Sequence, residues 1–143
     1  MTSLTLNVLL HLAAAAPVQQ DYTTAYQQTI ESGRPLVVLI GADWCPGCQQ
    51  MKQSAMPEVR KQGGLDHVTY AYVNSDRQSK LAEKLMHGGS IPQLILYRKT
   101  DKGWQRQQLT GAHSPTAIQA FLAQGRGTSP TADKSVENLS TRQ

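Results

Sequence analysis

The chain has 143 residues, 39% of them hydrophobic, with two cysteines and a formal net charge of +4. This length and apolar content predict one globular domain around a single core. The basic residues are scattered, with Arg60-Lys61 and Arg98-Lys99 as the only adjacent pairs, so nucleic acid is not an expected partner.

The first sixteen residues form an apolar segment that ends in four alanines before Pro17. Residues 1–16 are too few and too interrupted by polar side chains to cross a bilayer, so no stable membrane span is expected. Small residues after an apolar run resemble a secretory signal, although no Lys or Arg precedes the run. We therefore expect export to a periplasmic or other extracytoplasmic space, with cleavage after Ala15 or not at all. If the segment is instead a frayed helix or a misplaced gene start, the protein stays in the cytoplasm.

Hydrophobic periodicity and turn residues then predict an alternation of helices and strands. Helices are expected over residues 21–31, 49–56 and 77–86 and from Ser114-Pro115 onward, and strands over residues 36–40, 67–74, 93–98 and 104–109. Tyr22, Ala25, Tyr26 and Ile30 are expected to form the inward stripe of the first helix, and residues 67–74 an interior strand.

Two further features bear on how these elements are arranged. Pro57 is expected to kink the second helix, which carries no other helix breaker until that point. The turn residues between the last two strands predict a hairpin. The final segment, residues 125–143, is rich in Gly, Ser, Thr and charge, and we expect it to be a disordered tail.

The two cysteines stand in Trp44-Cys45-Pro46-Gly47-Cys48, directly after the apolar run at residues 36–40. Two thiols at this spacing at the start of a helix can form and break a disulfide, and the helix N-terminus favours a thiolate at the first position. A zinc site would need further Cys or His ligands at matching spacing, and none is present in the sequence, so no metal is expected. A purely structural disulfide stays open as an alternative, although closing so short a loop removes little conformational entropy from the unfolded chain.

A second informative segment is Gly88-Gly89-Ser90-Ile91-Pro92-Gln93, which leads into the strand expected at residues 93–98. Proline cannot donate a hydrogen bond within a sheet, so Pro92 belongs at the first residue of a strand or on an edge. By itself this segment predicts no more than an ordinary strand start.

Taken together, the segment from Ala42 to Cys48 and the Ile91-Pro92 pair resemble the thioredoxin superfamily, most of all the thioredoxin-like domains of exported or membrane-associated thiol:disulfide interchange proteins. The resemblance covers residues 20–124 and implies an α/β thioredoxin fold, a mixed central sheet with helices on both faces. It further implies that the Ile91–Pro92 bond is cis and packs against the dithiol, and that Gly111 is the glycine that recurs late in the last strand.

The resemblance implies a thiol:disulfide oxidoreductase that acts on protein thiols and disulfides without a cofactor. A redox partner protein would serve as its electron donor or acceptor. Cys45 would be the exposed attacking thiol and Cys48 the more buried resolving thiol. Pro46 and Gly47 would leave the sulfurs uncovered. Trp44 would form part of the rim on which the substrate rests, and the rest of its role would be core packing. The backbone of Ile91, beside Pro92, would pair with an extended substrate peptide.

The chain departs from thioredoxins at Leu39, six residues before Cys45, where they carry a buried acid that moves protons to and from the second thiol. We expect Leu39 to lie beneath Cys48 in an apolar pocket. The order Pro46-Gly47 also reverses the thioredoxin Gly-Pro. Electron flow in the reducing direction is therefore an expectation. The alternative is a non-enzymatic binding module or a Cu(I)-handling protein that uses both thiols.

Overall fold

A computed structural model of the protein describes residues 20–124, and the segments predicted as a signal and as a disordered tail lie outside these residues. Its elements run α1 (Tyr22–Ser32), β1 (Leu36–Gly41), α2 (Pro46–Gln50), η1 (Met51–Ala55), α3 (Met56–Lys61), β2 (Thr69–Asn74), α4 (Ser79–Leu85), β3 (Gln93–Thr100), β4 (Gly103–Thr110) and α5 (Pro115–Ala123). This is the order of helices and strands that the sequence predicts.

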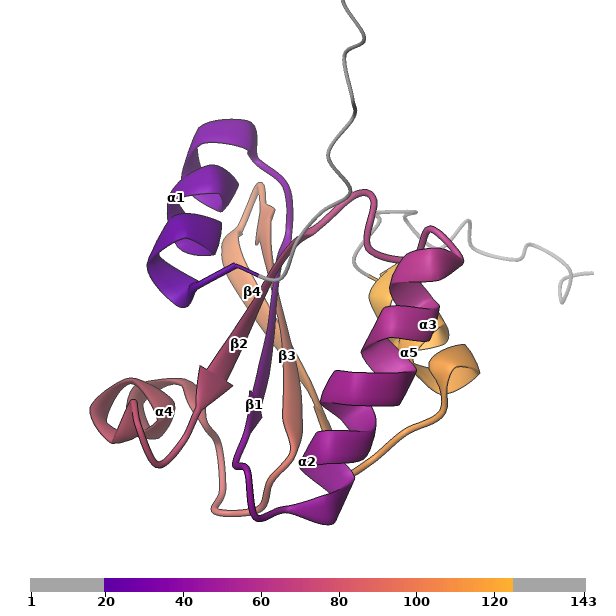
Figure 1. Cartoon of the computed structure of the whole chain (residues 1–143). Helices are drawn as coiled ribbons and strands as arrows, with labels where there is room; N and C mark the ends of the chain where they lie inside the picture. Colours follow the sequence, from indigo (N-terminus) through magenta and orange to yellow (C-terminus); the bar gives the residue numbers. More distant parts are fainter. Residues whose placement is uncertain (1–19, 125–143) are drawn as a thin grey trace, which may run out of the picture.

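The four strands form one mixed sheet in the order β2-β1-β3-β4. β1 pairs with β2 in parallel and with β3 antiparallel, and β3 and β4 form the predicted antiparallel hairpin. Helices cover both faces of this sheet, with α1 and α4 on one side and the α2–α3 segment and α5 on the other (Figure 1). The predicted α/β thioredoxin fold is therefore confirmed. The strand predicted as interior, β2, lies instead at an edge of the sheet, where Gln20 forms an isolated parallel bridge to Ala71.

The central strand β1 divides the core because successive side chains of a strand point to opposite faces. Val37 and Leu39 join the cluster under α5 and the α2–α3 segment. Leu36, Val38 and Ile40 join the cluster under α1 and α4. Every residue of β1 is buried, which explains why this strand has a continuous apolar sequence instead of an alternating one.

The first helix presents part of the predicted stripe to the sheet, since Tyr22 and Ala25 pack in the cluster under α1 and α4. Ala25 and Thr29 are its buried residues, whereas Tyr26 and Ile30 are about half exposed. Thr29 makes a hydrogen bond with the Thr69 hydroxyl of β2, and this buried polar contact orients the helix so that Tyr26 and Ile30 face outward. The prediction is therefore confirmed for Tyr22 and Ala25 and wrong for Tyr26 and Ile30.

The helix that follows the cysteines continues through Pro57 to Lys61, beyond the range 49–56 expected from the sequence, and Pro57 was expected to kink it. The turn just before Pro57 is a π-helix, in which the Met56 N–H donates to the Met51 carbonyl oxygen. Proline cannot donate a hydrogen bond, and its ring clashes with the carbonyl four residues earlier. One wider turn relieves this clash, so the helix accommodates Pro57 without ending.

Candidate active site

The two cysteines form a disulfide at the carboxyl end of β1, with their Cα atoms 5.2 Å apart. Cys45 directly precedes α2 and acts as its N-cap, because its sulfur accepts a hydrogen bond of 3.2 Å from the Cys48 N–H. Cys48 is fully buried, as predicted for the second thiol. Cys45 is less exposed than predicted, since only 7% of its surface is accessible. Ala42 and Ile91 pack against the pair.

The second predicted segment meets the first at this disulfide. The Ile91–Pro92 bond is cis, as expected from the resemblance, and Pro92 is buried. The backbone oxygen of Ile91 lies 3.9 Å from the Cys45 sulfur. The fold therefore brings Ile91 and Pro92 to the dithiol across 46 residues of chain.

Pro46 and Gly47 occupy the first turn of α2. Pro46 is exposed at a position where the missing N–H breaks no helical hydrogen bond. A Cβ on Gly47 would lie 3.5 Å from both Pro92 and Ala112, so this residue already fits closely between them. Gly111, which follows β4 with φ of +92°, donates its N–H to the Pro92 carbonyl oxygen at 2.9 Å.

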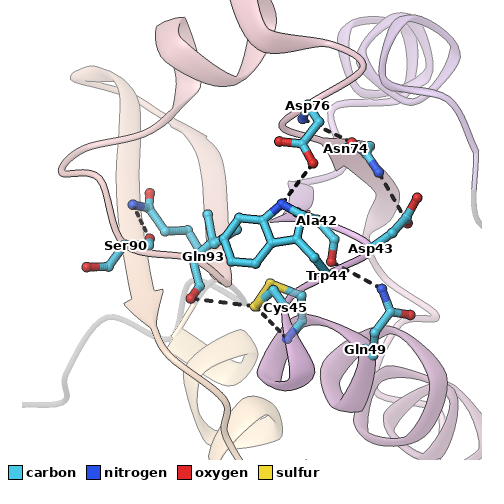
Figure 2. Close-up of a disulfide and its surroundings, with 11 residues drawn as sticks. Ala42, Asp43, Trp44, Cys45, Gln49, Asn74, Asp76, Ser90 and Gln93 are labelled. Atoms are coloured by element: carbon cyan, nitrogen blue, oxygen red, sulfur yellow. Dashed lines mark hydrogen bonds between the residues drawn. A yellow bond between two sulfur atoms is a disulfide. The ribbon is translucent and has the colours of Figure 1, made fainter.

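Trp44 stands on the surface beside the disulfide, with 70% of its area exposed. The predicted part of its role in core packing is therefore wrong. Its indole N–H donates to the Asp76 carboxylate at 2.9 Å, and Figure 2 shows the ring extending beside Cys45 toward this partner. The neighbouring Asp43 pairs with Arg77 at 2.7 Å and accepts a hydrogen bond from the Asn74 amide. The exposed ion pair contributes little free energy, whereas Asn74 is buried and ties this loop to the end of β2.

A buried polar residue that the sequence analysis missed holds the other side of the site. Gln93 is fully buried at the first position of β3. Its amide nitrogen lies 3.0, 3.2 and 2.9 Å from the carbonyl oxygens of His87, Gly88 and Ser90, and its oxygen accepts from the His87 N–H. These bonds fix the loop that carries Ile91 and Pro92. The only sequence signal was a glutamine at the start of an otherwise apolar strand.

Leu39 is fully buried in an apolar environment, as predicted, but its cluster is that of Met51 and Leu94 and is distinct from the cluster around the sulfurs. The residue of β1 that lies against Cys48 is Gly41. A Cβ on Gly41 would lie 2.8 Å from the Cys48 Cβ, so only glycine allows the helix to approach the strand this closely. This role has no signature in the sequence, where Gly41 is only the residue after the apolar run at 36–40.

Two further tests concern metals and membranes. Among residues 20–124, no group of three or more His, Cys, Asp or Glu side chains is placed to hold a metal ion. In the same part of the chain, no helix combines the length and apolar character needed to cross a bilayer.

Comparisons with known proteins agree with this architecture. A thioredoxin from Thermus thermophilus is 23% identical and superimposes with a TM-score of 0.63, covering 76% of this chain and 86% of that one. A Trichomonas vaginalis thioredoxin is 22% identical with a TM-score of 0.58, covering 75% and 93%. Trxlp from Edwardsiella tarda EIB202 is 27% identical with a TM-score of 0.57, covering 73% and 95%. The sequence itself matches the thioredoxin family over residues 17–124, and the chain therefore belongs to that family.

Proposed function

We propose that this protein is a thiol:disulfide oxidoreductase that reduces disulfides of protein substrates. The observation that carries the proposal is the Cys45–Cys48 disulfide, which lies beside the exposed indole of Trp44 and the backbone oxygen of Ile91. A structural disulfide needs neither an exposed aromatic side chain nor a backbone acceptor beside it. A site that receives a peptide uses both.

The reaction starts from the reduced pair. The Cys45 thiolate attacks one sulfur of a substrate disulfide, forms a mixed disulfide and releases the other substrate sulfur as a thiolate, which takes a proton from water. The hydrogen bond from the Cys48 N–H favours the charged form of Cys45 and so supports this attack. The position of Cys45 at the start of the helix also favours the thiolate, through the helix dipole.

Resolution then regenerates the disulfide seen in the structure. Cys48 loses its proton and attacks the Cys45 sulfur, and the bond between Cys45 and the substrate breaks. The substrate sulfur leaves with the electron pair and takes a proton, so two electrons have passed from the protein dithiol to the substrate. A redox partner protein must then reduce the Cys45–Cys48 disulfide for the next cycle.

Substrate recognition in this proposal uses backbone as well as side chains. An extended substrate peptide would pair with the backbone at Ile91, whose conformation is held by the Gln93 amide through the preceding loop. Trp44 would cover the peptide from the other side. The proposal also includes export, supported by the signal-like residues 1–16. Fusion of residues 1–19 to alkaline phosphatase, which is active only outside the cytoplasm, tests this part separately.

The function is tested by reduction of insulin disulfides with dithiothreitol as electron donor. The wild-type protein should accelerate the precipitation of insulin chains, and the Cys45→Ala variant should not exceed the uncatalysed rate. The Trp104→Phe variant, altered on the distant strand β4, serves as a folded control that retains the activity. Tight Cu(I) binding by both thiols without any acceleration of insulin reduction would contradict the proposal.

A further inference from the structure

Gly41 leaves room for two other residues to approach each other above the end of β1. A Cβ at this position would lie 3.1 Å from the Cys48 sulfur and 3.4 Å from the hydroxyl oxygen of Tyr72. The sulfur and the hydroxyl therefore border the same small space beside Gly41. Tyr72 comes from the edge strand β2, where it pairs in register with Leu39.

The Tyr72 hydroxyl is buried although its residue is partly exposed. Its oxygen has no hydrogen-bond partner within residues 20–124. An unpaired buried hydroxyl costs free energy, so such groups are retained most readily where another state of the protein supplies a partner. In the disulfide the Cys48 sulfur is neutral and a poor acceptor, whereas a Cys48 thiolate is a strong one.

The charges around Tyr72 suit a hydrogen-bond donor. The Lys52 ammonium lies over the phenol ring, 4.1 Å from its centre, one helical turn after Cys48 on the same helix face. The other charged groups near the ring are Asp43, Asp76 and Arg77. Burial is the main cause that raises the pKa of Tyr72, so the phenol keeps its proton at neutral pH and can donate it in a hydrogen bond.

We propose that the Tyr72 hydroxyl donates a hydrogen bond to the Cys48 thiolate and so stabilises it in the resolution step. This inference rests on the proposed function and supplies part of what thioredoxins obtain from the acid that Leu39 replaces. The hydroxyl keeps its own proton throughout. The Cys48 proton passes through water to the leaving substrate thiolate, while the new bond forms between Cys48 and Cys45.

The test follows the two thiol releases when the reduced protein reacts with dithiobis(nitrobenzoate) in a stopped-flow instrument. The first nitrothiolate reports attack by Cys45 and the second reports resolution by Cys48. The Tyr72→Phe variant keeps the ring beneath Lys52 and removes only the hydroxyl. Its second phase should be about tenfold slower at pH 7, with an apparent pKa about one unit higher, because a hydrogen bond to a charged group is lost. Its first phase should not change.

Tyr70→Phe is the matched control. Tyr70 lies two residues earlier on the same strand, and its hydroxyl is also buried without a partner in the described chain, but Arg60 and not Lys52 lies over its ring. This variant should leave both phases as in the wild type. An unchanged second phase in Tyr72→Phe, or an equal slowing in Tyr70→Phe, would overturn the inference while leaving the proposed function intact. Failure of the wild-type protein to release a second nitrothiolate would instead contradict the proposed function.

Discussion

The side-chain amide of Gln93 holds the backbone at Ser90, with 2.9 Å between the donating nitrogen and the accepting carbonyl oxygen. The same amide nitrogen reaches the carbonyl oxygens of His87 and Gly88. A single buried side chain thus fixes the loop whose next residue, Ile91, contacts the Cys45 sulfur. The dithiol and its neighbouring loop are therefore coupled through one glutamine that performs no chemistry itself.

Replacing Gln93 by methionine should destabilise the protein and loosen the site. Methionine preserves the length and the apolar packing of the side chain, but leaves the carbonyl oxygens of Gly88 and Ser90 without the donor that Gln93 supplies. We expect a loss of about 1–3 kcal/mol in the free energy of unfolding, measured by urea denaturation. Gln108→Met is the matched control, because the amide of Gln108, which is only partly buried, donates to the same His87 carbonyl oxygen. Equal losses in both variants would mean that burial of Gln93 is not the cause.

The steric role of Gly41 can be tested with the smallest possible side chain. Gly41→Ala places a methyl group 2.8 Å from the Cys48 Cβ, and neither β1 nor the helix can yield at low cost. Overpacking of this kind typically costs about 1–3 kcal/mol, which thermal or urea unfolding would detect. Gly47→Ala, whose methyl group would make ordinary contacts of 3.5 Å, should retain wild-type stability or gain slightly from better helix propensity. A fully stable Gly41→Ala protein would show that the strand and helix are not held this closely.

The roles of the two cysteines differ and are separable. Cys48→Ser should accumulate mixed disulfides between Cys45 and substrate proteins, since attack is retained and resolution is lost. Cys45→Ser should form no such adducts at an appreciable rate, because its remaining thiol is fully buried. Non-reducing electrophoresis after incubation with a protein disulfide measures both. Adducts that appear only with Cys45→Ser would mean that the roles are reversed.

Trp44 should matter for protein substrates and not for small ones. Its indole is 70% exposed and is oriented by Asp76, so removing it costs little stability but removes an aromatic contact surface. Trp44→Ala should raise KM for a protein disulfide by roughly tenfold, as expected for the loss of about 1.4 kcal/mol at an interface. The rate with dithiobis(nitrobenzoate) should stay close to that of the wild type. Trp104→Ala, which removes another exposed tryptophan, should change neither value.

The fold could be predicted from the sequence because its strongest local signals agree with one another. The buried run at β1, the cap and proline at Ser114-Pro115 and the hairpin turn each specify an element through local chemistry. The orientation of α1 could not be predicted, because the polar Thr29 faces the sheet and bonds to Thr69, a residue forty positions away. Only the tertiary structure shows that contact.

In the candidate site, too, some residues could be predicted from the sequence and others could not. Cys45 and Cys48 carry their chemistry in a short motif, and the cis bond at Ile91–Pro92 followed from the family resemblance. Gly41 and Gln93 were missed because their roles depend on what packs against them across the sheet and the loop. A glycine at a strand end and a glutamine at a strand start have no distinctive signature in one sequence.

The central claim, that the Cys45–Cys48 pair donates electrons to protein disulfides, is tested most directly by its reduction potential. Equilibration with defined ratios of reduced and oxidised dithiothreitol, followed by alkylation of free thiols, gives this value for the full chain. A reductant of the thioredoxin kind should have a reduction potential of about −270 mV, and we predict a value closer to this than to that of a disulfide donor. A potential of about −120 mV, typical of a strong disulfide donor, would contradict the proposed direction of electron flow.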